Sequence, residues 1–337
     1  MTAGQFIGGG ASGSYLEQLE AAKQFMHDHN DFLVVSHVQP DGDAISSTLA
    51  VAWLLDRMGK RYTLANEGDI PGKFSRLRGF DGIRTLSQLP DHLSYDTIIS
   101  VDCADFARIG RVSEKFAPDA KLLNIDHHAT NDRFGSCSVI QASAAATVEI
   151  IYDLSRHLEM EADIDFGTCI YTGLLTDTGG FRYSSTTPKV MKTAADLLEW
   201  GVKGAELAEA FLERMTFQQI RILQQGLATL DFHKNGRIST IAVSTEVIDA
   251  TGATNEDMDG LVNYARNVEG VEVGLLFKQR NESAVKVSLR SAGAVDVAQI
   301  AQTFGGGGHI RAAGCTINGS IEEAIRRVVE EVGNRLP

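Results

Sequence analysis

Six histidine and aspartate side chains between residues 37 and 177 could bind a pair of divalent cations. They come from four short segments that each follow or end an apolar stretch, and they are His37, Asp41, Asp43, Asp102, His127 and Asp177. Four carboxylates nearly balance the charge of two divalent cations, so the site would still accept an anionic phosphate ester. The set therefore indicates metal-assisted hydrolysis of a phosphoester, with one carboxylate shared by both ions.

Each segment also has an ordinary structural interpretation. The turn Pro40-Asp41-Gly42-Asp43 consists of turn formers, Asp102 could cap a strand end, and Asp177 could end a helix. His37 ahead of the turn, with a helical pattern directly after it, favours the ligand interpretation. The adjacent pair His127-His128 suits metal binding by one imidazole and substrate contact by the other.

The types of ligand narrow the choice of metal. Carboxylate oxygens combined with imidazole nitrogens suit Mn²⁺, whereas Mg²⁺ is less suited to nitrogen ligands and zinc would favour thiolates. We expect two Mn²⁺ ions, with Mg²⁺ or Co²⁺ as alternatives. The cysteines are scattered without a CxxC pair, which is typical of reduced thiols in a cytoplasmic protein: Cys103, Cys137, Cys169 and Cys315.

Length and composition favour a globular enzyme with two domains. At 337 residues the chain exceeds one typical core, and it has no apolar run of the roughly 18 residues that span a membrane. The net charge of −13 argues against coating long duplex nucleic acid, although a few local cations could hold a small phosphorylated ligand. We expect residues 1–14 to be a flexible lead or a tag remnant.

Strand and helix patterns alternate through the first half of the chain. Strands are expected at 32–36, 61–65, 97–101 and 121–125, and helices at 15–29, 44–58, 144–158 and 165–175. This alternation predicts an α/β fold with a doubly wound, mainly parallel sheet and helices on both faces. Such sheets bind ligands beyond the carboxyl ends of their strands, where three of the four acidic segments lie.

The second half has a different pattern, with a run of helices followed by shorter strands. Helices are expected at 187–200, 204–215, 217–225, 256–268, 297–304 and 320–335, and strands at 227–233, 237–243, 271–279 and 284–290. These elements predict a smaller mixed α/β domain, with a cleft between the two domains. The expected division is a catalytic domain at 15–200, a helical linker at 201–226 and a substrate domain at 227–337.

The glycine run from Gly305 to Gly308, followed by His309, has two interpretations. Four glycines usually form a flexible loop, but backbone amides without a neighbouring Cβ can also approach a phosphate closely. Arg290-Ser291 lies at the end of a predicted strand, and Arg108 follows Asp102 by six residues. Both could contact a substrate, and both could equally be ordinary surface residues.

Taken together, these segments resemble the motifs of the DHH phosphoesterase superfamily, which is named for a sequence that Asp126-His127-His128 matches letter for letter. The HxxPDGD turn, Asp102 and the TDTG segment at Asp177 extend the resemblance. Residues 305–314, GGGGHIRAAG, resemble the signature of the associated DHHA1 domain. From about Tyr15 onward the layout is similar to the bacterial branch of bifunctional oligoribonucleases (nanoRNases) and pAp phosphatases.

The resemblance implies that Asp102 bridges two metals. It implies that the first metal is bound by His37 and Asp41. The second metal would be bound by Asp43, His127 and Asp177. It also implies that His128 contacts the scissile phosphate or protonates the leaving oxygen, while Asp126 orients an imidazole. The substrate contacts that it implies are Arg108, Arg290, Ser291, Gly306, Gly307, Gly308 and His309.

The expected activity is 3'-5' hydrolysis of short RNA oligonucleotides to mononucleotides, together with dephosphorylation of pAp to AMP. One alternative is a phosphodiesterase for cyclic or linear di-adenylates, although membrane-bound relatives of that kind carry additional domains. An inorganic pyrophosphatase would lack the GGGGH signature, and a RecJ-type exonuclease would need further nucleic-acid-binding modules. A non-catalytic nucleotide sensor is the alternative of another class, and it would be expected to lack a ligand. The sequence leaves the oligomeric state open, with a homodimer as one option.

Overall fold

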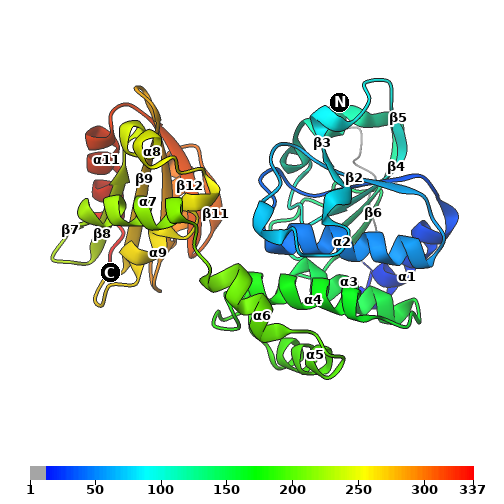
Figure 1. Ribbon diagram of the computed structural model, residues 1–337. Coiled ribbons are helices and arrows are strands. Elements are labelled where there is room, and N and C mark those ends of the chain that lie inside the picture. The colour runs from blue at the N-terminus through cyan, green and yellow to red at the C-terminus, as the bar shows by residue number, and fades with distance from the viewer. Residues whose placement is uncertain (1–12) are drawn as a thin grey trace. The chain divides into compact units, whose positions relative to one another are not determined.

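The computed structural model describes residues 13–337, which form two compact units divided between Arg214 and Met215. Of the lead expected at residues 1–14, residues 1–12 lie outside the described residues. Ser14, by contrast, caps the first helix, α1 (Tyr15–Asp28), through a reciprocal capping box with Glu17. Figure 1 shows a layered α/β arrangement within each unit. In the described part of the chain, no helix combines the length and the apolar character needed to cross a membrane.

The first unit is built on a six-stranded sheet in which every neighbouring pair is parallel. Its strands follow the order β3-β2-β1-β4-β5-β6. Their bounds are β1 Phe32–Val35, β2 Tyr62–Asn66, β3 Ile83–Thr85, β4 Tyr95–Val101, β5 Phe116–Asp126 and β6 Cys137–Ile140. The predicted parallel sheet is confirmed, with β3 and β6 as two strands that the sequence pattern did not show.

The strand order reverses direction between β1 and β4, which are hydrogen-bonded neighbours. Open parallel sheets bind ligands at this point, because the chain leaves the two strands towards opposite sides and opens a crevice beyond their carboxyl ends. His37 follows β1, and Asp102 directly follows β4. The topology therefore brings the first two acidic segments to the place where such folds bind ligands.

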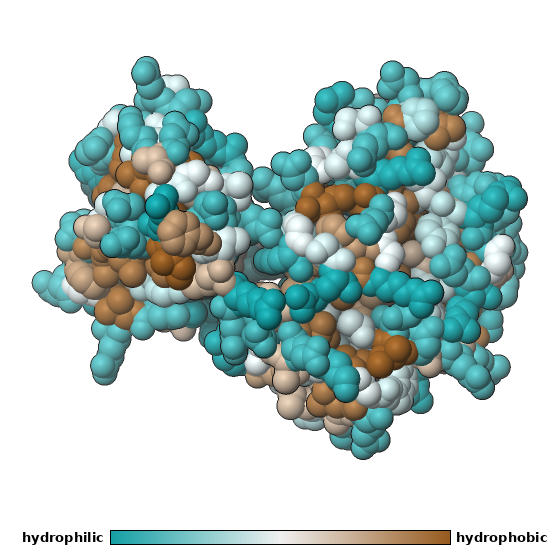
Figure 2. Space-filling view, viewed as in Figure 1, coloured by the Kyte–Doolittle hydropathy of each residue, from teal (hydrophilic) through white to brown (hydrophobic). Residues whose placement is uncertain are grey.

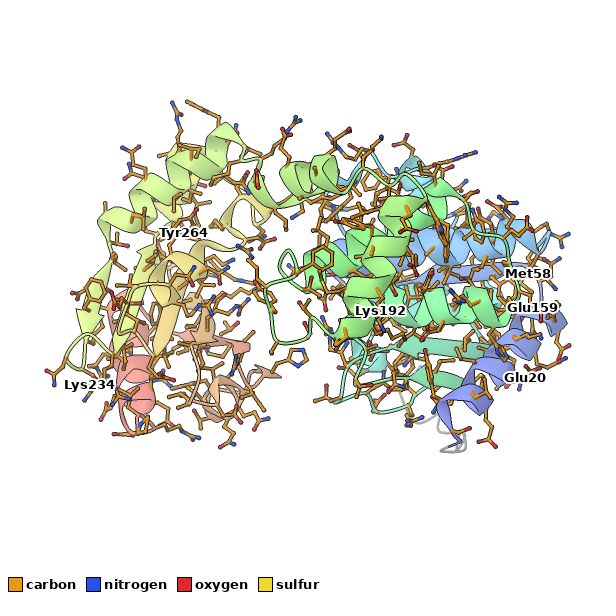
Figure 3. All side chains as sticks on the ribbon, turned by 90° about the horizontal axis from the view of Figure 1, so that it is seen from below. Glu20, Met58, Glu159, Lys192, Lys234 and Tyr264 are labelled. Carbon is orange, nitrogen blue, oxygen red and sulfur yellow. The ribbon has the colours of Figure 1, made fainter. Side chains whose placement is uncertain are left out.

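Helices cover one face of this sheet and form the larger core of the unit (Figure 1). Besides α1, the helices beside the sheet are α2 Gly42–Arg57 and α3 Thr147–His157. The helix α4 Ile164–Asp177 packs on α2 and α3, and α5 Pro188–Glu199 packs on α4. Figure 3 shows Met58 and Glu159, which follow the last residues of α2 and α3, on the same side of the unit. Since α2 and α3 pack together, both of their N-termini lie at the opposite end, where the acidic segments gather.

The other face differs from the expectation of helices on both sides. A 3₁₀ segment at Phe106–Lys115 covers it, together with apolar side chains such as Leu89 and Phe134. Gly110 interrupts the segment with a φ of 71°, which is incompatible with a continuous right-handed helix. The connection between β4 and β5 is therefore too short and too broken to form an α-helix.

The second unit has a six-stranded mixed sheet in the order β11-β12-β10-β9-β8-β7. The strands are β7 Asp231–His233, β8 Ile238–Val243, β9 Val273–Asn281, β10 Ala284–Ser291, β11 Gly307–His309 and β12 Ala312–Asn318. Only the pair β8–β9 is parallel among these neighbours. The smaller mixed domain is thus confirmed, but β11 and β12 were not expected as strands.

Two groups of helices pack on this second sheet. The helices α10 (Val297–Thr303) and α11 (Ile321–Gly333) cover one face. On the other face, α7 (Phe217–Ala228) packs against β8 and the short α8 (Thr245–Thr251), and α9 (Leu261–Arg266) packs mainly against β9. The helix expected at 256–268 is divided, because Gly260 adopts a φ of 79° between a 3₁₀ turn and α9. The face of β10 and β12 on that side carries polar and charged side chains.

Between α5 and α7 the chain forms α6 (Gly204–Ala208), which continues into a π-helical turn at Glu209–Glu213. The single helix expected at 204–215 is therefore shorter and changes its hydrogen-bonding pattern. Apolar side chains are gathered in four buried clusters, two in each unit. Figure 2 shows a mostly hydrophilic surface in that view, with separate apolar patches.

Candidate metal centre

The six expected ligands meet at one end of the parallel sheet. Their donor atoms form groups in which all atoms lie within 4.8 Å of one another: His37, Asp41 and Asp102; Asp43, His127 and Asp177; and Asp102, His127 and His128. Asp102 and His127 each belong to two groups. The structure thus gathers these side chains from the ends of β1, β4 and β5, the start of α2 and the end of α4.

Asp102 lies at the middle of this centre and is almost fully buried. Its Oδ2 is 3.5 Å from Nε2 of His37, and its Oδ1 is 3.6 Å from Nε2 of His127. The two oxygens therefore face two different imidazoles. Asp102 adopts a left-handed φ of 57°, which is uncommon for a residue with a side chain and is typical of strained functional positions.

Backbone carbonyls fix the orientation of both imidazoles. Nδ1 of His37 donates to the carbonyl of Val38 at 2.9 Å, and Nδ1 of His127 donates to the carbonyl of Ala144 at 3.3 Å. Because a carbonyl oxygen can only accept, each Nδ1 must carry the proton. In the neutral ring, each Nε2 is then unprotonated and carries a free lone pair. A histidine binds a metal in this form.

Asp43 and Asp41 approach the centre from the start of α2. Asp41 caps the helix by accepting from the amides of Asp43 and Ala44, each at 3.1 Å. Asp43 is buried beside α4, where Gly173 allows the close approach because a Cβ there would lie 2.9 Å from Oδ1 of Asp43. A Cβ on Gly42 would likewise overlap Thr176. The two glycines bring the turn against the helix that carries Asp177.

The crowded charges perturb the titration of the centre. Burial raises the pKa of Asp177 to about 7 and raises the pKa of Asp43, where the charges of Asp102 and Asp177 act in the same direction. Burial alone would lower the pKa of His127, but the Asp102, Asp177 and Asp43 carboxylates raise it to about 9. In Asp102 the nearby imidazoles overcome burial and hold the pKa below its usual range. This excess of negative charge is the environment that a bound cation would relieve.

His128 is held by the carboxylate of the same motif. Nδ1 of His128 donates to Oδ1 of Asp126 at 2.7 Å, and the fully buried Asp126 also accepts from Nδ2 of Asn131 at 2.7 Å on its other oxygen. The ring of His128 packs edge-on against His127, with 4.7 Å between the centroids. Asp126 thus contacts His128, and the two imidazoles of the motif have different partners.

The donor set fits divalent cations. Two ligands about 2.1 Å from one ion lie about 3.0–3.4 Å apart at octahedral or tetrahedral angles. The measured separations of 3.5 and 3.6 Å around Asp102 are close to this range and too long for strong hydrogen bonds. Nε2 of His127 is also 3.6 Å from Oδ2 of Asp177. These separations are therefore compatible with cations bound between these side chains.

The substrate contacts expected in the second unit lie on neighbouring strands. Arg290 and Ser291 are consecutive in β10, so their side chains point to opposite faces, and Ser291 is buried while its hydroxyl accepts from the amide of Gly293. Gly307, Gly308 and His309 form the edge strand β11, and His309 is exposed. The glycine run is therefore partly a strand.

Two of these glycines are required by packing. A Cβ on Gly306 would overlap the backbone of Gly314, and Gly308 has a φ of 144° close to β12. In the first unit, Arg108 is half-buried near the metal centre, and its carbonyl accepts from the amide of Val38 at 2.8 Å. Its main chain thus supports the segment that carries His37.

Comparison with known proteins agrees with this fold and centre. The profile described as DHH family, N-terminal domain, matches residues 31–174, and the DHHA1 domain matches residues 239–336. The chain therefore belongs to the DHH phosphoesterase family.

Among curated proteins, the chain is 38% identical over 311 residues to the bifunctional oligoribonuclease and PAP phosphatase NrnA of Thermus thermophilus, covering 90% of the chain and 89% of that protein. It is 25% identical over 293 residues to the protein of the same name from Bacillus subtilis, covering 86% and 90%. An exopolyphosphatase-related protein from Bacteroides fragilis shares the fold with a TM-score of 0.88 at 24% identity, covering 94% of this chain and 96% of that one.

The structure also shows polar residues around the centre that the sequence patterns did not indicate. Thr147 contacts both Asp43 and Asp102, and Asn131 contacts Asp126. A helix start at Ala146, which cannot cap a helix with its side chain, was the available signal for Thr147. No local pattern distinguishes Asn131, since its contact depends on how the segment after β5 folds back.

Proposed function

We propose that the chain hydrolyses short RNA oligonucleotides to mononucleotides and removes a phosphate from pAp. The observation that carries this proposal is the metal centre, in which Asp102 lies between two groups of ligands beyond the carboxyl ends of parallel strands. The names of the Thermus and Bacillus relatives support the choice of substrates. The free cysteines fit a reducing compartment, and we propose the cytoplasm.

In this proposal His37 and Asp41 hold one divalent cation, while Asp43, His127 and Asp177 hold the other. Asp102 is shared by both. The bound ions would supply a water molecule of lowered pKa and would neutralise charge that develops on the phosphate. Mixed oxygen and nitrogen ligands favour Mn²⁺ for both positions, with Co²⁺ or Mg²⁺ as weaker substitutes.

His128 has the role of holding a proton near the leaving oxygen. Its Nδ1 donates to the buried Asp126, which fixes the orientation of the ring. Arg108, half-buried near the centre, would bind a phosphate oxygen. No nucleophilic side chain is needed, because water attacks the phosphorus.

The second unit supports an anionic substrate longer than one nucleotide. Lys278 in β9 lies directly opposite Lys286 in β10, and Arg290 lies on the same face, since its paired residue Gly274 is four positions from Lys278. Lys278 is only 8% exposed. Burial, followed by the charges of Lys286 and Arg280, lowers the pKa of Lys278. Like charges held together in this way are suited to binding successive phosphates, as are Arg290 in β10 and His309 in β11.

The test is a set of parallel assays on metal-free protein to which Mn²⁺ is added. The substrates are RNA dimers to pentamers, pAp, cyclic di-AMP, linear di-adenylate and pyrophosphate. We expect hydrolysis of the short RNAs and pAp that depends on Mn²⁺ and falls to background after chelation. Hydrolysis confined to pyrophosphate or to cyclic di-AMP would contradict the proposal, as would full activity in protein shown by elemental analysis to contain no metal.

A further inference from the structure

Thr147 is the first residue of α3, and it donates hydrogen bonds to two carboxylates of the metal centre. Its hydroxyl donates to Oδ1 of Asp102 at 3.0 Å, and its amide donates to Oδ2 of Asp43 at 2.6 Å. Asp43 and Asp102 come from different elements and belong to different ligand groups. One fully buried residue therefore contacts both sides of the centre.

The start of α3 lacks a capping side chain of its own. Its N-cap is Ala146, which makes no side-chain hydrogen bond, so the first amides of the helix need an acceptor from elsewhere. Asp43 supplies it from α2, because its two oxygens accept from the amides of Thr147 and Val148, the second at 3.1 Å. The helix N-terminus thus orients Asp43.

The hydroxyl of Thr147 acts on the other carboxylate. Oδ1 of Asp102 also faces Nε2 of His127, and an ionised carboxylate has about four lone-pair positions. A neutral donor at one position fixes the carboxylate in rotation and leaves the others available for cations. A lysine or arginine there would neutralise the charge and compete with the metal, whereas a hydroxyl does neither.

We propose that Thr147 is a positioning residue that sets the spacing of the two metals by holding Asp102 and Asp43 in register. This inference rests on the proposed metal centre. Removal of the hydroxyl should lower the affinity for the cation that binds second. The expected loss is roughly 10-fold to 100-fold, which is what outer partners of metal ligands contribute. It should also weaken the magnetic coupling between two Mn²⁺ ions, because that coupling depends on a shared carboxylate in a fixed orientation.

The test compares full-length Thr147→Val and Thr147→Ser variants with the parent chain. Valine keeps the shape and the amide of residue 147 but removes the hydroxyl, and serine restores it. Calorimetric titration with Mn²⁺ gives the two affinities, and electron paramagnetic resonance reports the coupling. A matched control is Thr172→Val, which removes a buried hydroxyl in α4 that has no hydrogen-bond partner among the described residues.

We expect weaker binding of the second ion and reduced coupling in Thr147→Val, with parental values in Thr147→Ser and Thr172→Val. Parental affinities and coupling in Thr147→Val, or equal losses in the valine and serine variants, would overturn the inference. If the valine variant fails to fold, Thr147→Ala compared with Thr147→Ser isolates the hydroxyl again. A parent chain that binds fewer than two ions would instead contradict the metal centre itself.

Discussion

The two units concentrate opposite charges on their sheets. At the end of the parallel sheet, four aspartates that could bind metal lie with three imidazoles within a few ångströms, and the pKa values of Asp43 and Asp177 are raised. In the mixed sheet, Lys278 and Lys286 are directly opposed, and the pKa of each is lowered, first by burial, although the nearby Asp259 acts in the opposite direction. A ligand of the opposite charge would stabilise both arrangements.

The two units therefore hold like charges close together in two ways, with carboxylates in the first unit and lysines in the second. In the proposed function, the acidic centre binds cations that take part in the chemistry, whereas the basic face binds phosphates without reacting with them. Changes in the first unit should therefore reduce the rate for every substrate. Changes on the basic face should reduce affinity in proportion to the number of phosphates.

The largest effect is expected for Asp102→Asn. The amide keeps the size of the carboxylate but lacks the charge to be shared by two ions, so kcat/KM should fall by more than about 100-fold. The loss should be similar for pAp and for an RNA trimer. Steady-state kinetics with Mn²⁺ measures it, and Asp119→Asn, at an exposed position of β5, is the control that should remain active. A loss for the trimer alone would contradict the expectation that changes in the first unit reduce the rate for every substrate.

A smaller effect is expected for Asp126→Asn. The neutral amide would orient His128 less firmly, so kcat should fall by about 10-fold to 100-fold with little change in KM. Asn131→Ala, which removes the other contact of Asp126, should act in the same direction but more weakly. An unchanged kcat in Asp126→Asn would show that the contact between Asp126 and His128 does not matter for the reaction.

Lysine variants test the basic face. Lys278→Gln and Lys286→Gln should each raise KM for RNA trimers to pentamers by about tenfold, since a charge-assisted hydrogen bond contributes about 1.5 kcal/mol. KM for pAp should change much less, and the salt dependence of RNA binding should become shallower. Lys234→Gln, in the turn between β7 and β8 (Figure 3), is the control. Equal losses for pAp and pentamer would place these lysines at the reacting phosphate instead.

The smallest expected effect concerns stability. Lys278→Gln removes one of two opposed like charges, so the free energy of unfolding should rise by about 0.2–1 kcal/mol. A lysine whose pKa is lowered by folding destabilises the native state while it is protonated in both states. The gain should therefore be complete below the lowered pKa of Lys278 and disappear as the pH rises towards the ordinary lysine pKa. Urea unfolding at several pH values measures it, and a loss of stability would show that Lys278 has a favourable partner.

Much of the first unit could be predicted from the sequence. Apolar runs such as Phe32–Val35 and Tyr95–Val101 end in residues that could bind metal, and parallel strands bring such ends to one edge. The order of the strands could not be predicted, because it depends on contacts between segments far apart in the chain. The second face was misjudged as helical, since local patterns gave no warning of the 3₁₀ segment interrupted at Gly110.

The residues that support the centre were harder to predict. Thr147 lies 104 positions from Asp43 and 45 from Asp102. A helix start at Ala146 shows that a capping side chain is missing, but not that Asp43 takes its place. The opposed lysines depend on the register of β9 and β10, which a sequence pattern does not define. Neither interpretation of the glycine run included a strand, because β11 is stabilised by pairing with β12 and not by its own composition.

Anomalous scattering from crystals grown with Mn²⁺ tests the central claim most directly. The account predicts two manganese peaks in each chain, one beside His37 and Asp41 and the other beside Asp43, His127 and Asp177, with Asp102 in contact with both. A single peak, or two peaks of which neither contacts Asp102, would contradict it.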